Sequence, residues 1–281
     1  MKTRDATPPP LTGLFLALML VLPAQVAQSR APDDMTPLPK YPGGSAPPAG
    51  KADPRHRPAP GAAAALDSLP PLPLAAIGVV DLGESFCTGT VVGPRIVLTA
   101  AHCVFNAFGQ VRMPRRFLAG HGENGTLAEA RVVEAFIPPD YNLRRFQETN
   151  DIDGLDWAIL ELDTDIGVMT GEVEIASFDR KQLKTYDGAS RSFVQIGYGE
   201  KDGDVVTIRP GCTVIEAWDD NTFGHNCGSV SGDSGGPDLA FIEGRWQIIG
   251  IESAEIDTDA SKGVDMAVSA RAFAAEAARH R

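Results

Sequence analysis

The sequence predicts an all-β globular domain, and two observations carry this prediction. First, short apolar runs bounded by Gly, Pro, Asn or Asp recur from about residue 77 onward, which is typical of antiparallel strands. Examples are residues 95–98, 130–137, 193–196, 246–251 and 264–268. Second, aromatic and β-branched residues concentrate in the same part of the chain. Helix is expected in the turn after His102 and in residues 269–279, whose alanines favour it.

The amino-terminal end has the layout of a secretory signal peptide, which we expect to span residues 1–27. Lys2 and Arg4 precede an apolar run from Leu11 to Leu22, and the small residues Ala24 and Ala27 follow it. A run of about a dozen residues is short of the roughly 20 needed to cross a bilayer, so a permanent anchor is the weaker interpretation. Export, to the periplasm or out of the cell, is therefore expected.

Residues 28–73 are rich in Pro, Ala and Gly, and such a segment buries too little apolar surface to offset the entropy of ordering it. It is expected to be a disordered linker, and a flexible spacer and a removable pro-peptide both fit its composition. With 43% hydrophobic and 22% charged residues over 281 positions, the chain as a whole is not disordered. The globular domain is expected at residues 74–281.

Two distant segments supply a base and a nucleophile. The first is Thr99-Ala100-Ala101-His102-Cys103, and the second is Gly232-Asp233-Ser234-Gly235-Gly236-Pro237. A serine hydroxyl is a poor nucleophile at neutral pH and needs an imidazole to take its proton. The glycines around Ser234 permit a tight backbone that aims the amides of Gly232 and Ser234 at a developing oxyanion. The pair predicts hydrolysis by acyl transfer.

A carboxylate is also required to fix the tautomer of the histidine. Asp156 is the strongest candidate, because it directly precedes the apolar run Trp157-Ala158-Ile159-Leu160, where a buried strand would hold it out of water. Asp151, Asp153 and Asp163 lie nearby and compete for this role. The acidic cluster lacks the spacing of a calcium loop.

These segments resemble the trypsin/chymotrypsin-like serine proteases, in particular their secreted bacterial members. The resemblance covers residues 77–270 and also includes residues 87–92 and Gly197-Tyr198-Gly199. It implies two six-stranded antiparallel β-barrels with the site in the cleft between them. It further implies that Ser234 attacks the scissile carbonyl, that His102 shuttles the proton and that Asp156 orients His102. The expected activity is that of a serine endopeptidase acting on proteins or peptides.

The resemblance also locates a specificity pocket. Its floor is implied at Gly228, six residues before the nucleophile, and its wall at the strand holding Ser253 and Glu255. No aspartate stands on the floor, so the usual residue for Arg or Lys preference is missing. Glu255 could restore that preference by pointing a carboxylate into the pocket, or it could narrow the pocket in favour of small side chains.

Activation in this family involves a new amino terminus that pairs with the aspartate before the nucleophile, here Asp233. The Ile-Val-Gly-Gly start of the family would fall near Gly61, and the sequence Gly61-Ala62-Ala63-Ala64 does not match it. Residues 77–79 are too close to Cys87 for this role. Asp233 is therefore expected to find another cation or hydrogen-bond donor.

Four cysteines in an exported chain favour two disulfides, for which three pairings are possible. The resemblance implies that Cys87 pairs with Cys103, which leaves Cys212 with Cys227. A Cys/His zinc site is the alternative, but the sequence lacks a CxxC pair. No metal and no cofactor are expected. His225, close to Cys227, is expected to pack or hydrogen-bond beside the disulfide rather than to touch substrate.

The formal net charge of −12 argues against nucleic acid and anionic membrane surfaces as partners, so no membrane association is expected after signal cleavage. A monomer is expected. Two other functions fit parts of the sequence. A catalytically silent relative that only binds would be expected to lack a triad member, and this chain keeps all three. An α/β-hydrolase esterase requires Gly-x-Ser-x-Gly with the histidine after the serine, the reverse of the order here.

Overall fold

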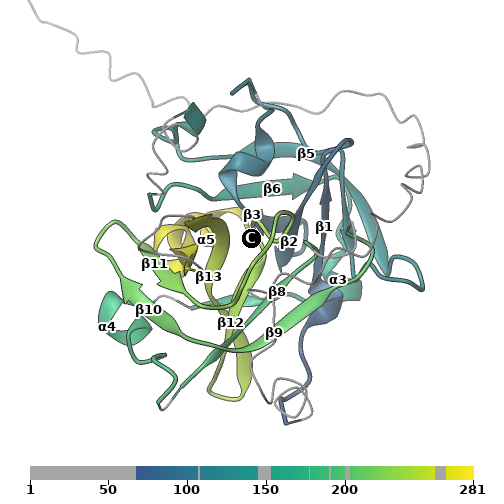
Figure 1. Ribbon diagram of the computed structural model, residues 1–281. Helices are drawn as coiled ribbons and strands as arrows, with labels where there is room; N and C mark the ends of the chain where they lie inside the picture. Colours follow the sequence, from purple (N-terminus) through teal and green to yellow (C-terminus); the bar gives the residue numbers. More distant parts are fainter. Residues whose placement is uncertain are drawn as a thin grey trace, which may run out of the picture.

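The computed structural model describes residues 68–106, 108–144, 153–176, 178–189, 191–199, 203–256 and 264–281. The expected signal peptide and most of the expected linker lie outside these residues. None of the described helices is both long and apolar enough to cross a membrane. The described strands form two bodies, one built from blue and teal strands such as β1, β5 and β6, the other from green strands such as β10, β12 and β13 (Figure 1).

The first body is a closed antiparallel barrel of six strands in the order β1-β2-β3-β6-β5-β4. Its interior is filled by apolar side chains, and every residue of β1, β3 and most of β6 is buried, as the apolar runs in the sequence predict. The strands are β1 (Ile77–Asp81), β2 (Phe86–Gly93), β3 (Ile96–Thr99), β4 (Arg116–Ala119), β5 (Ala128–Phe136) and β6 (Ala158–Leu162).

The second body is an eight-stranded sheet in the order β10-β11-β14-β13-β12-β8-β9, with the short β7 pairing in parallel with β13. It curls into a half-barrel, so the predicted all-β, trypsin-like fold class is confirmed. The strands are β7 (Glu174–Ile175), β8 (Phe193–Gly197), β9 (Thr207–Cys212), β10 (Val214–Ala217), β11 (Thr222–His225), β12 (Pro237–Ile242), β13 (Arg245–Ile256) and β14 (Val264–Ser269).

Short helices join and cover the two bodies. The carboxy-terminal helix α5 fastens them together, because it follows β14 and packs its His280 ring 4.1 Å from Phe136 of β5. Arg281 then donates to the carbonyl of Val173. The helices are α3 (Gly167–Thr170), α4 (Arg180–Leu183) and α5 (Ala274–His280), with 3₁₀ turns at Leu74–Ala76, Ala101–Val104 and Ala270–Ala272. The helices expected after His102 and near the carboxy terminus are thus present.

Residues 68–73, placed in the expected linker, contact the folded domain. Leu69 and Leu72 pack against its core, and the indole Nε1 of Trp246 donates to the carbonyl of Pro71 at 3.0 Å. Two leucines among prolines bury apolar surface that a composition average over residues 28–73 does not register. Ordered packing therefore includes Leu69, Pro71 and Leu72.

Candidate active site

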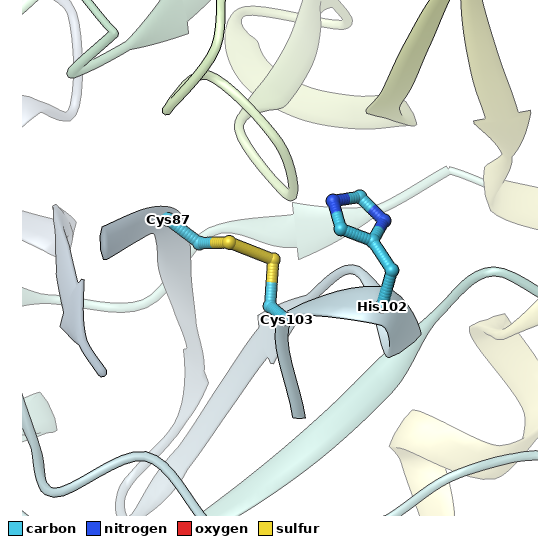
Figure 2. Close-up of side chains that lie close together, drawn as sticks. All are labelled: Cys87, His102 and Cys103. Carbon is cyan, nitrogen blue, oxygen red and sulfur yellow. A yellow bond between two sulfur atoms is a disulfide. The ribbon is translucent and has the colours of Figure 1, made fainter. Parts of the chain in front are cut away.

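The His102 side chain is presented by a 3₁₀ turn, Ala101–Val104, that follows β3 directly. The next residue, Cys103, is bonded to Cys87 of β2, and Figure 2 shows the imidazole beside this disulfide. The cross-link ties the turn to the barrel strand that precedes it. His102 is thereby held on the rim of the first barrel.

Asp156, at the entrance to β6, is fully buried and contacts His102 twice. Its Oδ1 accepts from the backbone N of His102 at 2.9 Å, and its Oδ2 lies 2.8 Å from the ring Nδ1. Burial by itself raises the pKa of this carboxyl, but the neighbouring His102 outweighs burial and the pKa is lowered. Burial likewise lowers the pKa of His102, and the charge of Asp156 reverses that effect, so its pKa is raised above 6.5.

The other acids proposed from the sequence lie elsewhere. Asp163 is paired with Arg131 at 2.9 Å on the outside of the first barrel. Asp153 accepts from the backbone N of Leu155 within its own turn. Asp151 lies outside the described residues. Among the three candidates that the structure describes, Asp156 is the one that contacts His102.

Ser253 of β13 adds a third contact to the same carboxylate, since its hydroxyl donates to Asp156 Oδ2 at 2.5 Å. The ladder between β13 and β14 shifts register between Glu252 and Ala254, which marks a bulge at Ser253. A bulge re-aims the side chains around it. This is how a residue of the second sheet reaches the aspartate of the first barrel.

The Ser234 loop is fitted directly against the histidine segment. The carbonyl of Ser234 accepts from the backbone N of Thr88 at 2.9 Å. A Cβ added to Gly235 would lie 2.2 Å from Thr99 Oγ1 and 2.6 Å from the backbone N of Ala100, so no larger residue fits there. The Ser234 loop, which belongs to the second sheet, therefore lies against Ala100, two residues before His102 in the sequence.

The backbone around Ser234 is held in a tight turn. Gly232 has a φ of +102°, a left-handed conformation that favours glycine. The carbonyl of Asp233 accepts from Gly236 N at 2.7 Å, and because a trans peptide directs its N–H opposite to its C=O, the Ser234 amide points the other way. The carbonyl of Gly232 is held by the hydroxyl of Thr88 at 2.9 Å.

Asp233 has a cationic partner that sequence reasoning did not identify. The guanidinium of Arg209, on β9, lies 3.0 Å from Asp233 Oδ2 and is itself nearly buried. The same carboxylate accepts from the backbone N of Gly199 at 2.8 Å and of Val230 at 2.9 Å. Arg209 lies in a short run, residues 205–210, that carries no catalytic motif, and the pairing of β8 with β9 brings it to Asp233.

A cavity of about 80 Å³ opens beside Ser234 and is lined by residues 229–231, Ser234 and residues 252–254. Ser253, assigned to the pocket wall, lines it. Gly228, assigned to the floor, is not among these residues, and its backbone N donates to Asp265 Oδ2 at 2.6 Å. The side chain of Glu255 lies outside the described part of the structure.

Glu252 lines this cavity and was missed from the sequence. The same signal that picked out Asp156, an acid adjoining an apolar strand run, applies to Glu252, which follows residues 248–251. Its carboxylate is buried and accepts from the Ser229 hydroxyl at 2.7 Å. His225 also lies here, fully buried, with its Nε2 3.1 Å from Glu252. His225 thus pairs with a cavity residue rather than lying only beside the disulfide.

Both expected disulfides, Cys87–Cys103 and Cys212–Cys227, are formed. Two groups of possible metal ligands occur in the described part of the chain, one around His102 and one around His225. Each includes a cysteine whose sulfur is in a disulfide, so neither offers the thiolate that binds metals. The disulfides and fold are compatible with an exported protein.

Comparison with known proteins agrees with this architecture. The family model described as Trypsin matches residues 74–275, which is most of the chain. A solved structure of a Glu endopeptidase in complex with MPD matches with a TM-score of 0.56 and 22% identity, covering 74% of this chain and 90% of the other. At that identity the match shows the fold. Fold and family together support a serine protease in the broad sense, and the chain belongs to the trypsin family.

Proposed function

We propose that the protein is an exported serine endopeptidase that cleaves peptide bonds through an acyl-enzyme on Ser234. In this mechanism His102 takes the proton from the Ser234 hydroxyl and returns it to the leaving amine. Asp156 holds the imidazole in the tautomer whose Nε2 carries a lone pair and accepts this proton, and the amides of Gly232 and Ser234 stabilise the oxyanion.

The observation that carries the proposal is the double contact between Asp156 and His102. A carboxylate that accepts from both the backbone N and the ring Nδ1 of one histidine fixes the backbone position and the ring orientation together. Complete burial of Asp156 keeps water from competing for either contact. A purely structural histidine rarely needs a buried carboxylate bonded to both its ring and its backbone, whereas a histidine that acts as a general base does.

The contacts of Asp233 support a standing oxyanion loop. Arg209 and two backbone amides occupy the carboxylate that, in the family, receives the new amino terminus. Because Arg209 belongs to the folded domain, the loop needs no inserted chain end. Residues 1–27 then act as an export signal and residues 28–67 as a spacer, and the product is a monomeric secreted or periplasmic enzyme acting on proteins or peptides.

Labelling with a fluorophosphonate probe, mapped by mass spectrometry with the amino terminus recorded in the same run, tests the proposal. Stoichiometric labelling of Ser234, together with hydrolysis of an unfolded protein substrate that is lost in Ser234→Ala, is expected. A folded protein that is neither labelled nor active would be a silent relative. If limited proteolysis then restored labelling, the chain would be a zymogen, and the role given to Arg209 would be wrong.

Preference for glutamate is not carried over from the matched Glu endopeptidase, because a likeness at 22% identity shows the fold alone. The substrate preference of this protein has to be inferred from the residues that line the cavity beside Ser234.

A further inference from the structure

The cavity beside Ser234 contains a buried carboxylate that the triad and the oxyanion hole do not use. Glu252 follows the apolar part of β13, and its backbone is bonded to the nucleophile loop on both sides. Its N donates to the carbonyl of Gly236 at 2.9 Å, and its carbonyl accepts from Gly235 N at 2.7 Å. The backbone of Glu252 is therefore held at a fixed position relative to the Ser234 loop.

The two oxygens of Glu252 differ. Oε2 accepts a hydrogen bond from the Ser229 hydroxyl at 2.7 Å and lies 3.1 Å from Nε2 of His225. Oε1 is buried and has no hydrogen-bond partner among the residues that the structure describes. Because the single hydroxyl hydrogen of Ser229 is donated to Glu252, the Ser229 oxygen can only accept a hydrogen bond from a ligand. This part of the cavity thus presents acceptors, and it suits a donor.

The charges behind the cavity point in the same direction. Glu252, Asp238 and Asp265 come from three strands and surround one histidine, His225, from a fourth. Burial, and next the charge of Glu252, raise the pKa of Asp265 to about 6, and burial raises the pKa of Asp238 to about 8. Burial lowers the pKa of His225, but the neighbouring carboxylates outweigh it and raise that pKa to about 9. Three carboxyl groups therefore gather around one imidazole, so acidic groups outnumber basic groups in this cluster.

We infer that Glu252 is the specificity-determining residue of this site and selects a lysine side chain at the position before the scissile bond, ahead of arginine. A cation in the cavity supplies the missing donor to Oε1 and suits a cluster in which carboxyl groups outnumber basic groups. An acidic side chain would meet the Glu252 carboxylate and the lone pairs of Ser229. A guanidinium binds a carboxylate best through both oxygens, whereas an ammonium is a point charge that one oxygen can hold.

This inference rests on the proposed protease function and assigns to β13 a task that the resemblance placed at Gly228. It also differs from the sequence-based suggestion for Glu255, since Glu252 is three residues earlier and lines the cavity. Because of the bulge at Ser253, neighbouring residues of β13 have different contacts. Ser253 contacts Asp156, and Glu252 faces the cavity together with Ser229.

Initial rates on peptides that differ only in the residue before the scissile bond test the inference. The wild-type protein is expected to give the highest kcat/KM with Lys, then Arg, and about 10² to 10³ less with Ala or Glu. In Glu252→Gln the ratio of Lys to Ala should fall by about 10². Glu216→Gln, which changes an exposed carboxylate on β10 of the same sheet, should leave the ratio as it is.

n-Butylammonium provides a second measurement that does not depend on the folding of a variant. It is expected to inhibit the wild-type protein competitively, and butanol at the same concentration is not. Preference for Glu, Ala or Phe, or absence of inhibition by n-butylammonium, would overturn the inference, and Arg ahead of Lys would overturn its single-oxygen argument. Labelling of Ser234 in the same preparations separates these outcomes from failure of the protease proposal itself.

Discussion

Asp156 has to do two things to His102, fix its orientation and set its basicity. Changing it to Asn keeps the size and removes the charge, so kcat is expected to fall by about 10⁴ because the wrong tautomer is favoured. On the acid side, the pH dependence of kcat/KM reports the pKa of His102 in the enzyme without substrate, because the neutral imidazole is the base. In the wild type the midpoint of this dependence should lie above pH 6.5, and in Asp156→Asn it should move down, because burial then acts without the opposing charge. An unchanged midpoint in Asp156→Asn would mean that another group sets the basicity.

Ser234 and His102 are expected to act as one unit. Ser234→Ala and His102→Ala should each lower turnover by several orders of magnitude, and the double variant should be little worse than either, since each alone abolishes the proton transfer. Steady-state kinetics on a protein substrate measures this. Additive losses, or single losses of only a few fold, would contradict the assignment.

Arg209 is a positioning residue in our proposal, because it touches Asp233 and not the substrate. Arg209→Met leaves a buried carboxylate without its cation, so kcat and the rate of fluorophosphonate labelling should fall by up to about 10². Arg209→Lys restores a cation and should recover most of the labelling rate. Arg131→Met, which breaks an exposed pair with Asp163, is the matched control and should have little effect. Equal loss in the Met and Lys variants would indicate a packing role instead.

At the scale of single elements, the end of β8 shows why a glycine motif was visible in the sequence. A Cβ on Gly197 would lie 2.2 Å from Asp233 Oδ1, so Gly197→Ala must push the Asp233 loop away. The expected result is a loss of about 1–3 kcal/mol in the free energy of unfolding, with a lower labelling rate at Ser234. In Gly122→Ala no heavy atom lies within 4 Å of the added Cβ, and denaturant unfolding should be unchanged. Equal tolerance of both substitutions would show that the loop is not tightly fitted.

The elements also show what the sequence could and could not predict. Strands β1, β3 and β6 follow from apolar runs, and Asp156 from its place at the start of one of them. The resemblance supplied the pairing of the cysteines and the barrel architecture. Arg209 and Glu252 were missed because their partners, Asp233 and His225, are distant in sequence and meet only through strand pairing. Residues 68–73 were assigned by average composition, which hides two leucines that pack.

At the scale of the whole molecule, the buried cluster around His225 should make stability depend on pH. The folded-state pKa of His225, about 9, exceeds its unfolded value, so its contribution is complete below about pH 6.5 and is lost as the pH rises towards 9. Asp238 acts in the same direction, since its raised pKa makes ionisation in the folded state costly. Urea unfolding between pH 6.5 and 9 should show the free energy of unfolding falling by several kcal/mol. A flat profile would show that the cluster does not titrate as a buried unit.

In the proposed function, the Arg209–Asp233 pair determines when the protease becomes active in the cell that makes it. A protease that waits for a cut can be stored, and its onset is timed by a second protease. Here the cation is part of β9, so in the proposed mechanism it reaches Asp233 as soon as the second sheet forms, and folding and catalytic competence become one event. Restraint must then come earlier, from keeping the chain unfolded until export, or later, from an inhibitor that meets the finished enzyme.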